Sequence, residues 1–149
     1  MAERARVRDS GPGVDGIAIH HVGIAVDDLD VAIATYANLF GGTVEHRDVV
    51  PDQGVEAASV RIGPSRVELL HPLGPETPVG RFVAGRGPGL HHVAFEVADL
   101  ESELARLRSD GVELIDDEPR LGLFGLQVAF IHPQATGGVL AELVCDGRG

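Results

Sequence analysis

The residues best suited to chemistry are two histidine pairs and two glutamates that recur at matching positions. His20 and His21 lie in "IHHVGIAV", and His91 and His92 lie 71 positions later in "LHHVAFEV". The glutamates, Glu68 in "RVELL" and Glu142 in "LAELV", are flanked by branched apolar residues. Burial of such groups is unfavourable unless they are paired or bind a metal. Two imidazoles and two carboxylates suit an octahedral divalent ion that keeps two positions for water or substrate.

We therefore predict one metal site made by His21, Glu68, His92 and Glu142. Neighbouring residues of a strand point to opposite faces of a sheet. His20 and His91, the first member of each pair, are accordingly expected to face away from this site.

The elements that must position these side chains also recur. An amphipathic helix is expected after each histidine strand, in "DDLDVAIATYANLF" and in "ADLESELARLRSDG". Three strands should follow each helix: residues 42–50, 55–62 and 65–73 in the first half, and 111–119, 126–133 and 137–145 in the second. A unit of this size buries little core alone, so the two halves should pack on each other. The pattern predicts an α+β fold of two tandem βαβββ modules.

The expected domain organisation is a flexible arm at residues 1–16 followed by a single domain at 17–149. Its modules cover about residues 17–71 and 90–145. They are joined by a Pro/Gly-rich linker, residues 72–89, that could hold a short helix near residues 79–84.

Composition excludes several classes of function. The net charge of −11 is the wrong sign for binding nucleic acid or an anionic membrane surface. The chain has no lysine, which excludes Schiff-base chemistry. No apolar run approaches the ~20 residues that span a bilayer. Cys145 is the single cysteine, so no internal disulfide forms, and we expect a cytoplasmic protein.

Longer stretches of the chain resemble a known family. They are "IHHVGIAVDDLDVAI", "VELLHPLGPETPVGRFVAGRGPGLHHVAFEV", "GVELIDDEPRLG" and "VAFIHPQATGGVLAELV", which together cover nearly all of residues 17–144. These stretches are similar to the methylmalonyl-CoA epimerases of the vicinal oxygen chelate superfamily. The resemblance implies a curved mixed sheet around a metal site, with His21, Glu68, His92 and Glu142 as ligands. It also implies a homodimer.

The activity implied by the resemblance is epimerisation at C2 of methylmalonyl-CoA or a related 2-substituted malonyl-CoA thioester. A divalent ion, Co²⁺ first and otherwise Mn²⁺, Ni²⁺, Mg²⁺ or Fe²⁺, would chelate the substrate oxygens and stabilise an enolate. Inversion needs acid/base groups on both faces of that enolate. Glu142 is the expected base on one face.

The second base is where the chain departs from the family pattern. Some members carry a glutamate four residues after the Gln of a "QGV" motif; here that position is Ala57, and Glu56 stands one place earlier. A shift of one residue moves a side chain to the opposite face of a strand. Either a local bulge returns Glu56 to the site as the second catalytic group, or Glu56 lies on the surface. Leu123 and Phe124 are a further departure, since family members usually carry small or polar residues there. Their bulk is expected to reshape the acyl pocket, so the substrate could be a different 2-substituted malonyl-CoA or no CoA ester at all.

The sequence leaves two other functions open. A glyoxalase I-like lyase of the same superfamily uses similar ligand positions. A metal-free small-molecule binding protein is the alternative from a different class, although such proteins generally lack the paired His and Glu set.

Overall fold

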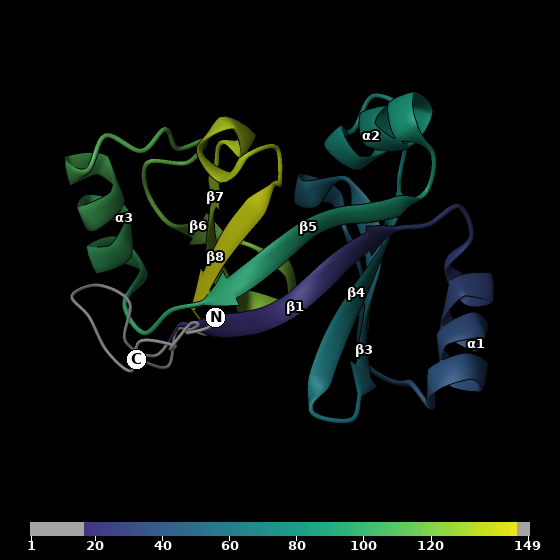
Figure 1. The fold of residues 1–149 in the computed structure, drawn as a ribbon. Coiled ribbons are helices and arrows are strands. Elements are labelled where there is room, and N and C mark those ends of the chain that lie inside the picture. The colour runs from purple at the N-terminus through teal and green to yellow at the C-terminus, as the bar shows by residue number, and fades with distance from the viewer. Residues whose placement is uncertain (1–16, 146–149) are drawn as a thin grey trace, which may run out of the picture.

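The computed structural model describes residues 17–145, so the predicted arm at residues 1–16 lies outside the described residues, as do residues 146–149. Within them, the α+β fold of two βαβββ modules is confirmed (Figure 1). The first module consists of β1 (Ala18–Ala25), α1 (Leu29–Phe40), β2 (Thr43–Val50), β3 (Val55–Ile62) and β4 (Ser65–Pro72). The second consists of β5 (Gly89–Glu96), α3 (Leu100–Ser109), β6 (Arg120–Leu121), β7 (Gln127–Ile131) and β8 (Ala141–Cys145).

The connection between the modules carries α2 (Pro78–Arg86), which confirms the short helix expected there. Its first turn is fixed by Thr77, whose hydroxyl accepts a hydrogen bond from the backbone of Gly80, and by a proline at the first helical position. Three short 3₁₀ turns complete the described elements: η1 (Pro51–Gln53), η2 (Leu123–Gly125) and η3 (Pro133–Thr136). No helix within residues 17–145 has the length and apolar character needed to cross a bilayer.

One eight-stranded mixed sheet joins the two modules, in the order β2-β3-β4-β1-β5-β8-β7-β6. The modules meet where β1 and β5 pair antiparallel, and these two strands run side by side across the middle of Figure 1. Each of them also pairs in parallel with the last strand of its own module, β1 with β4 and β5 with β8. The four central strands, β4-β1-β5-β8, are therefore related by an approximate two-fold axis between β1 and β5.

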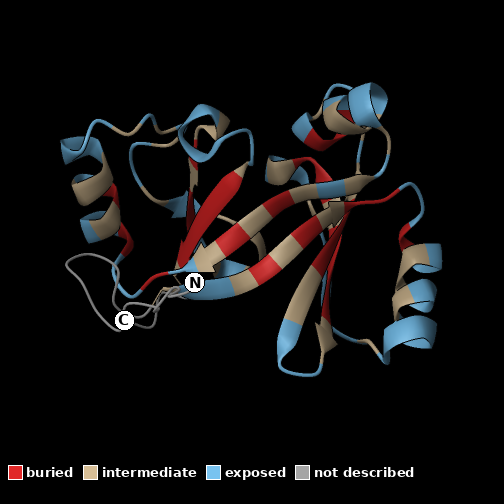
Figure 2. Ribbon diagram, viewed as in Figure 1, coloured by how far each residue is buried: buried red, intermediate tan, exposed pale blue. Residues whose placement is uncertain are grey.

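The helices α1 and α3 begin at equivalent aspartates. Asp28 caps α1 by accepting from the backbone of Val31, and Asp99 caps α3 by accepting from the backbone of Ser102. Each helix packs on strands of its own module and buries an apolar stripe against them. The cluster beneath α1 is built on Leu29, Val60 and Leu69, and that beneath α3 is built on Leu100, Leu104, Ile131 and Leu143. Figure 2 shows the matching alternation of buried and less buried residues along β1 and β5.

The second strand of the second module differs from the prediction. Residues 111–119 form no strand but a single bridge between Leu114 and Ile131, and the short β6 follows instead. The cause lies at Asp116, whose carboxylate accepts the backbone N–H of Phe130 at 2.8 Å. A side chain thus takes the acceptor position that a backbone carbonyl would hold in a continuing ladder.

Candidate metal centre

The four predicted ligands lie on the four central strands. His21 is on β1, Glu68 on β4, His92 on β5 and Glu142 on β8. All four residues are buried, with exposed fractions between 2% and 7%. Each module therefore contributes one histidine and one glutamate to the interior of the curved sheet.

The strand register explains why these side chains meet. Gly23 is paired with both Glu68 and His92, and Ala94 is paired with both Glu142 and His21. Each row across the sheet thus places a very small residue between a histidine and a glutamate. A Cβ on Gly23 would lie only 2.2 Å from Cε1 of His92. The imidazole of His92 therefore occupies space that exists only because residue 23 is glycine.

Three of the four predicted ligands, His21, His92 and Glu142, bring their ligand atoms together, and Glu68 contacts this group through His21. Nε2 of His21 lies 3.2 Å from Nε2 of His92, 3.3 Å from Oε1 of Glu68 and 3.4 Å from Oε1 of Glu142. Nε2 of His92 lies 3.1 Å from the same Glu142 oxygen. Adjacent ligands of an octahedral ion with bonds of ~2.1 Å are about 3.0 Å apart. His21, His92 and Glu142 in particular form a group that could hold a metal ion, and Glu68 borders it.

Without an ion, the surroundings give the two carboxyl groups very different pKa values. Burial and the nearby charge of Glu142 raise the pKa of Glu68 to about 8. Burial alone would also raise the pKa of Glu142, but hydrogen bonds from His21 and His92 outweigh it and lower that pKa to about 2. Burial lowers the pKa of His21. The metal-free site thus carries one ionised carboxylate facing two imidazoles, which is a donor set that a divalent cation can complete.

The prediction that His20 and His91 face away from the site is wrong. The β1–β5 pairing is irregular at two places: His20 is an extra residue between Ile19 and His21, and His91 is an extra residue between Leu90 and His92. At a bulge, two residues of one strand oppose a single residue of the other. Both members of each histidine pair therefore lie on the same face, with their Nδ1 atoms 2.8 Å apart in the first pair and 3.0 Å apart in the second.

Glu56 is not brought to this cluster. The β3–β4 register runs without a bulge, and it places Ser59 opposite Glu68 and Ala57 opposite Leu70. Glu56 consequently points to the other face of the sheet, where it accepts a hydrogen bond from Nε of Arg47 at 3.1 Å. The site-facing position belongs to Ala57, which is fully buried in an apolar cluster. Of the two arrangements open on the sequence, the structure has the one in which Glu56 lies outside the site.

Residues 121–126 form a strap of which the sequence indicated only Leu123 and Phe124 as residues that could shape the acyl pocket. The strap belongs to the second module but contacts the first, where Leu123 and Phe124 pack on the cluster that contains Val55, Ala57 and Leu70. Phe124 adopts a left-handed conformation with φ +58°, and its ring stacks on His46 with centroids 5.3 Å apart. A bulky residue rarely adopts this φ, so packing must hold it there.

The strap lies between two cavities beside the ligands. The first, of about 260 Å³, is largely apolar and is bordered by His92, Glu142, Leu123, Val55 and Phe130. The second, of about 330 Å³, is more polar, and its walls include Glu68, His20, Arg66, Ser59 and Phe124. A small molecule with an apolar substituent and oxygen atoms could thus reach the ligand cluster from either side.

The comparisons with known proteins agree with this architecture. Residues 20–130 match the model of the glyoxalase/bleomycin resistance protein/dioxygenase superfamily. Human mitochondrial methylmalonyl-CoA epimerase is 36% identical over 126 residues, which cover 84% of this chain and 72% of the human protein. Ethylmalonyl-CoA/methylmalonyl-CoA epimerase of Cereibacter sphaeroides is 38% identical over 128 residues, covering 84% of this chain and 95% of that protein.

A solved structure extends the likeness to a ligand complex. It is a variant of Streptomyces coelicolor methylmalonyl-CoA epimerase in complex with 2-nitronate-propionyl-CoA. The two chains superpose with a TM-score of 0.84 at 39% sequence identity, over 88% of this chain and 95% of that one.

Proposed function

The chain belongs to the glyoxalase/bleomycin resistance protein/dioxygenase superfamily, and from this premise we propose that it is an isomerase that epimerises C2 of a 2-substituted malonyl-CoA thioester. Methylmalonyl-CoA is the first candidate substrate, in keeping with the names of its relatives. The observation that carries the proposal is the grouping of His21, His92 and Glu142, with Glu68 against His21, beside a largely apolar cavity.

In the proposed site His21, Glu68, His92 and Glu142 hold a divalent ion. When bound, such an ion supplies positive charge that makes a proton next to a thioester carbonyl easier to remove. The imidazoles present Nε2 toward this position, and burial keeps water from competing for it. We propose Co²⁺ as the native ion, although the donor set also suits Mn²⁺, Ni²⁺, Mg²⁺ and Fe²⁺.

Glu142 is the proposed base. Its carboxylate borders the 260 Å³ cavity, so an oxygen not engaged by the histidines can reach a substrate proton there. Glu56 is not retained in this role, because its carboxylate is paired with Arg47 on the opposite face of β3. Val55, Leu123 and Phe130 line the same cavity and would receive the 2-alkyl group. After Glu142 takes the C2 proton, inversion requires a proton for the opposite face of C2, and we propose that water admitted to the polar cavity beside Glu68 and Ser59 supplies it.

The decisive experiment follows C2 in deuterated water. The Co²⁺-loaded protein is incubated with (2R)- or (2S)-methylmalonyl-CoA, and deuterium incorporation and configuration at C2 are measured. We expect metal-dependent exchange with inversion, lost in His92→Ala and strongly reduced in Glu142→Gln. Glu113→Gln is the matched control, because Glu113 is an exposed carboxylate that faces His132 on the surface.

Other outcomes would redirect the proposal. Exchange reduced as strongly by Glu56→Gln as by Glu142→Gln would mean that Glu56 reaches the substrate. A metal-replete protein that exchanges nothing would exclude methylmalonyl-CoA, and the hemithioacetal of a glyoxalase I-like lyase would be tested next. A purified protein that takes up no stoichiometric metal would favour a binding function instead.

We also propose that the protein works as a cytoplasmic homodimer. Ile19 on β1 and Leu90 on β5 are 62% and 68% exposed, although both lie on the two central strands. A second copy of the chain would cover these apolar side chains. Light scattering after size exclusion, with an Ile19→Glu/Leu90→Glu variant that should be monomeric, measures the assembly.

A further inference from the structure

Four histidine rings form one continuous line across the junction of the modules. Nδ1 of His20 lies 2.8 Å from Nδ1 of His21, Nε2 of His21 lies 3.2 Å from Nε2 of His92, and Nδ1 of His92 lies 3.0 Å from Nδ1 of His91. Each pair of neighbouring rings meets edge to face, with centroids 5.1 to 5.2 Å apart. The line is symmetric, with the predicted metal ligands inside and His20 and His91 outside.

The two bulges in the β1–β5 pairing create this arrangement. In a regular strand His20 and His91 would point to the far face of the sheet, out of reach of their neighbours. Instead, each is the extra residue of a bulge at the equivalent place in its module. Bulges often re-aim a side chain next to a functional site.

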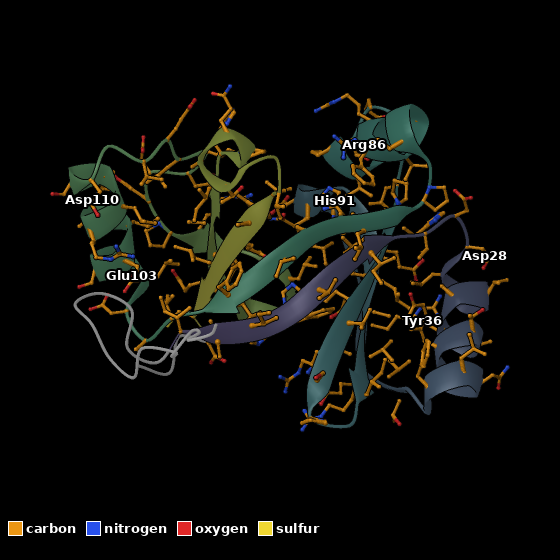
Figure 3. The ribbon with its side chains drawn as sticks, in the orientation of Figure 1. Asp28, Tyr36, Arg86, His91, Glu103 and Asp110 are labelled. Carbon is orange, nitrogen blue, oxygen red and sulfur yellow. The ribbon has the colours of Figure 1, made fainter. Side chains whose placement is uncertain are left out.

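The rings of His20 and His91 also contact residues that surround the site. Phe82 of α2 meets the ring of His91 edge-on, with centroids 4.9 Å apart. Figure 3 shows His91 on β5 below α2, near Arg86. His20 borders the polar cavity, together with Ser59 and Glu68. Neither outer histidine is a free surface residue.

The inner contacts restrict where the protons of His21 and His92 can be. An imidazole that offers the Nε2 lone pair to a metal carries its hydrogen on Nδ1. For His21 this hydrogen points to Nδ1 of His20, and for His92 it points to Nδ1 of His91. If the outer ring donated instead, the inner ring would carry its hydrogen on Nε2, where it would block the ion.

We propose that His20 and His91 are positioning residues of the metal site, each of which accepts the Nδ1–H of the adjacent ligand and so holds its Nε2 lone pair toward the ion. The inference rests on the metal site of the proposed function. It assigns no ligand role to the outer histidines. It explains instead why the chain has a histidine pair, and a bulge, at both equivalent strands.

Paired substitutions distinguish a hydrogen-bond acceptor from a packing residue. Asn can place an oxygen near the position of the histidine Nδ1, whereas Phe keeps the ring and lacks an acceptor. The affinity of the metal-free full-length protein for Co²⁺ is measured by titration calorimetry, without substrate. We expect His20→Phe and His91→Phe each to weaken binding about 10- to 100-fold, the range typical for loss of a partner behind a ligand. His20→Asn and His91→Asn should lie within a few-fold of wild type.

The controls separate this effect from general damage. His132→Ala removes a half-buried histidine outside the line, whose ring contacts Glu113 and the backbone N–H of Gln134, and should bind Co²⁺ as wild type does. Urea unfolding of each metal-free variant reports whether it folds. Should His20→Phe fail to fold, the His91 pair of variants carries the same test in the other module.

Each result decides the inference. Phe variants with wild-type affinity, or Asn variants as weak as the Phe variants, would overturn it. A wild-type protein that binds no Co²⁺ would overturn it together with the proposed metal. If Co²⁺ binds and the Phe and Asn variants separate as expected, while methylmalonyl-CoA is not turned over, the positioning role stands and only the proposed reaction fails.

Discussion

The buried carboxyl of Glu68 should make the metal-free protein less stable as the pH rises above neutrality. Its side chain is almost fully buried, and burial together with the charge of Glu142 raises its pKa to about 8. In the unfolded chain this group ionises near its usual value of 4.5. Between these values the folded state binds a proton that the unfolded state has released, so stability falls as the pH rises.

The histidines of the site change stability in the opposite direction to Glu68, and they do so over a lower range of pH. Burial lowers the pKa of His20 and His21, and it lowers that of His91 to about 4, from the usual 6.5. Up to about pH 7.5 the unfolded chain therefore binds protons that these folded residues do not, which makes stability rise with pH in that range. Between pH 6.5 and 8 the ionisation of Glu68 opposes this rise and lowers stability by about 1.6 kcal/mol, since the folded group is half ionised at the upper limit.

The measurement is urea unfolding of the chelator-treated protein across this interval. Far-UV circular dichroism is the suitable signal, because the chain has no tryptophan and a single tyrosine. Between pH 6.5 and 8 we expect the free energy of unfolding of the wild-type protein to fall by about 1.6 kcal/mol relative to that of Glu68→Gln, because the histidine contribution is common to both proteins and cancels in the difference. Saturating Co²⁺ should remove this difference. The same pH dependence in both proteins would refute the reasoning.

Three further substitutions have clear expected outcomes. In Gly23→Ala the added Cβ would lie 2.2 Å from Cε1 of His92, so calorimetry should show a Co²⁺ affinity at least about tenfold lower. The control is Gly85→Ala in α2, whose added Cβ meets nothing within 4 Å. This control should keep the Co²⁺ affinity, and its free energy of unfolding in urea should rise by about 0.5 kcal/mol. Leu123→Ala enlarges the apolar cavity, so the ratio of kcat/KM for ethylmalonyl-CoA over methylmalonyl-CoA should rise several-fold, and an unchanged ratio would remove Leu123 from the acyl pocket. Leu104→Ala truncates a residue on the buried face of α3 that is 1% exposed, and it should lower the unfolding free energy by about 2–5 kcal/mol, with Co²⁺ affinity unchanged.

The sequence predicts the fold class and the approach of the two His/Glu pairs because both follow from repetition. Equivalent residues of two similar modules meet when their strands lie beside the axis that relates the modules, and β1 and β5 pair across that axis. The capping aspartates, Asp28 and Asp99, recur with the same spacing and place both helices correctly. Periodicity is informative here because the modules share one pattern of buried and exposed positions.

Features that depend on pairing between distant strands were not predictable in this way. The bulges at His20 and His91 arise from the register between β1 and β5, which alternation within either strand does not specify. The face of Glu56 depended on whether a similar bulge exists between β3 and β4, and there it does not. The expected strand at residues 111–119 fails because a single carboxylate, Asp116, replaces a backbone acceptor.

The strap was predicted only in part. The sequence marked Leu123 and Phe124 as bulky residues that could reshape the acyl pocket, but it did not indicate that they contact the first module. Their contact with the first module results from the path of the chain between β6 and β7 and from the left-handed backbone at Phe124. Glycines at positions 122 and 125 give a turn signal, but they do not indicate which surface the turn contacts.

The division of the ligands between the modules has a consequence for folding. His21 and Glu68 come from one module, His92 and Glu142 from the other, so an ion bound by all four requires both modules to be folded and docked. A ligand that binds only this state stabilises it by about 2.7 kcal/mol when present at 100 times its dissociation constant. The lifetime of the protein in a cell would then depend on the free concentration of its metal, and a shortage of the ion would lower the amount of folded protein as well as its activity.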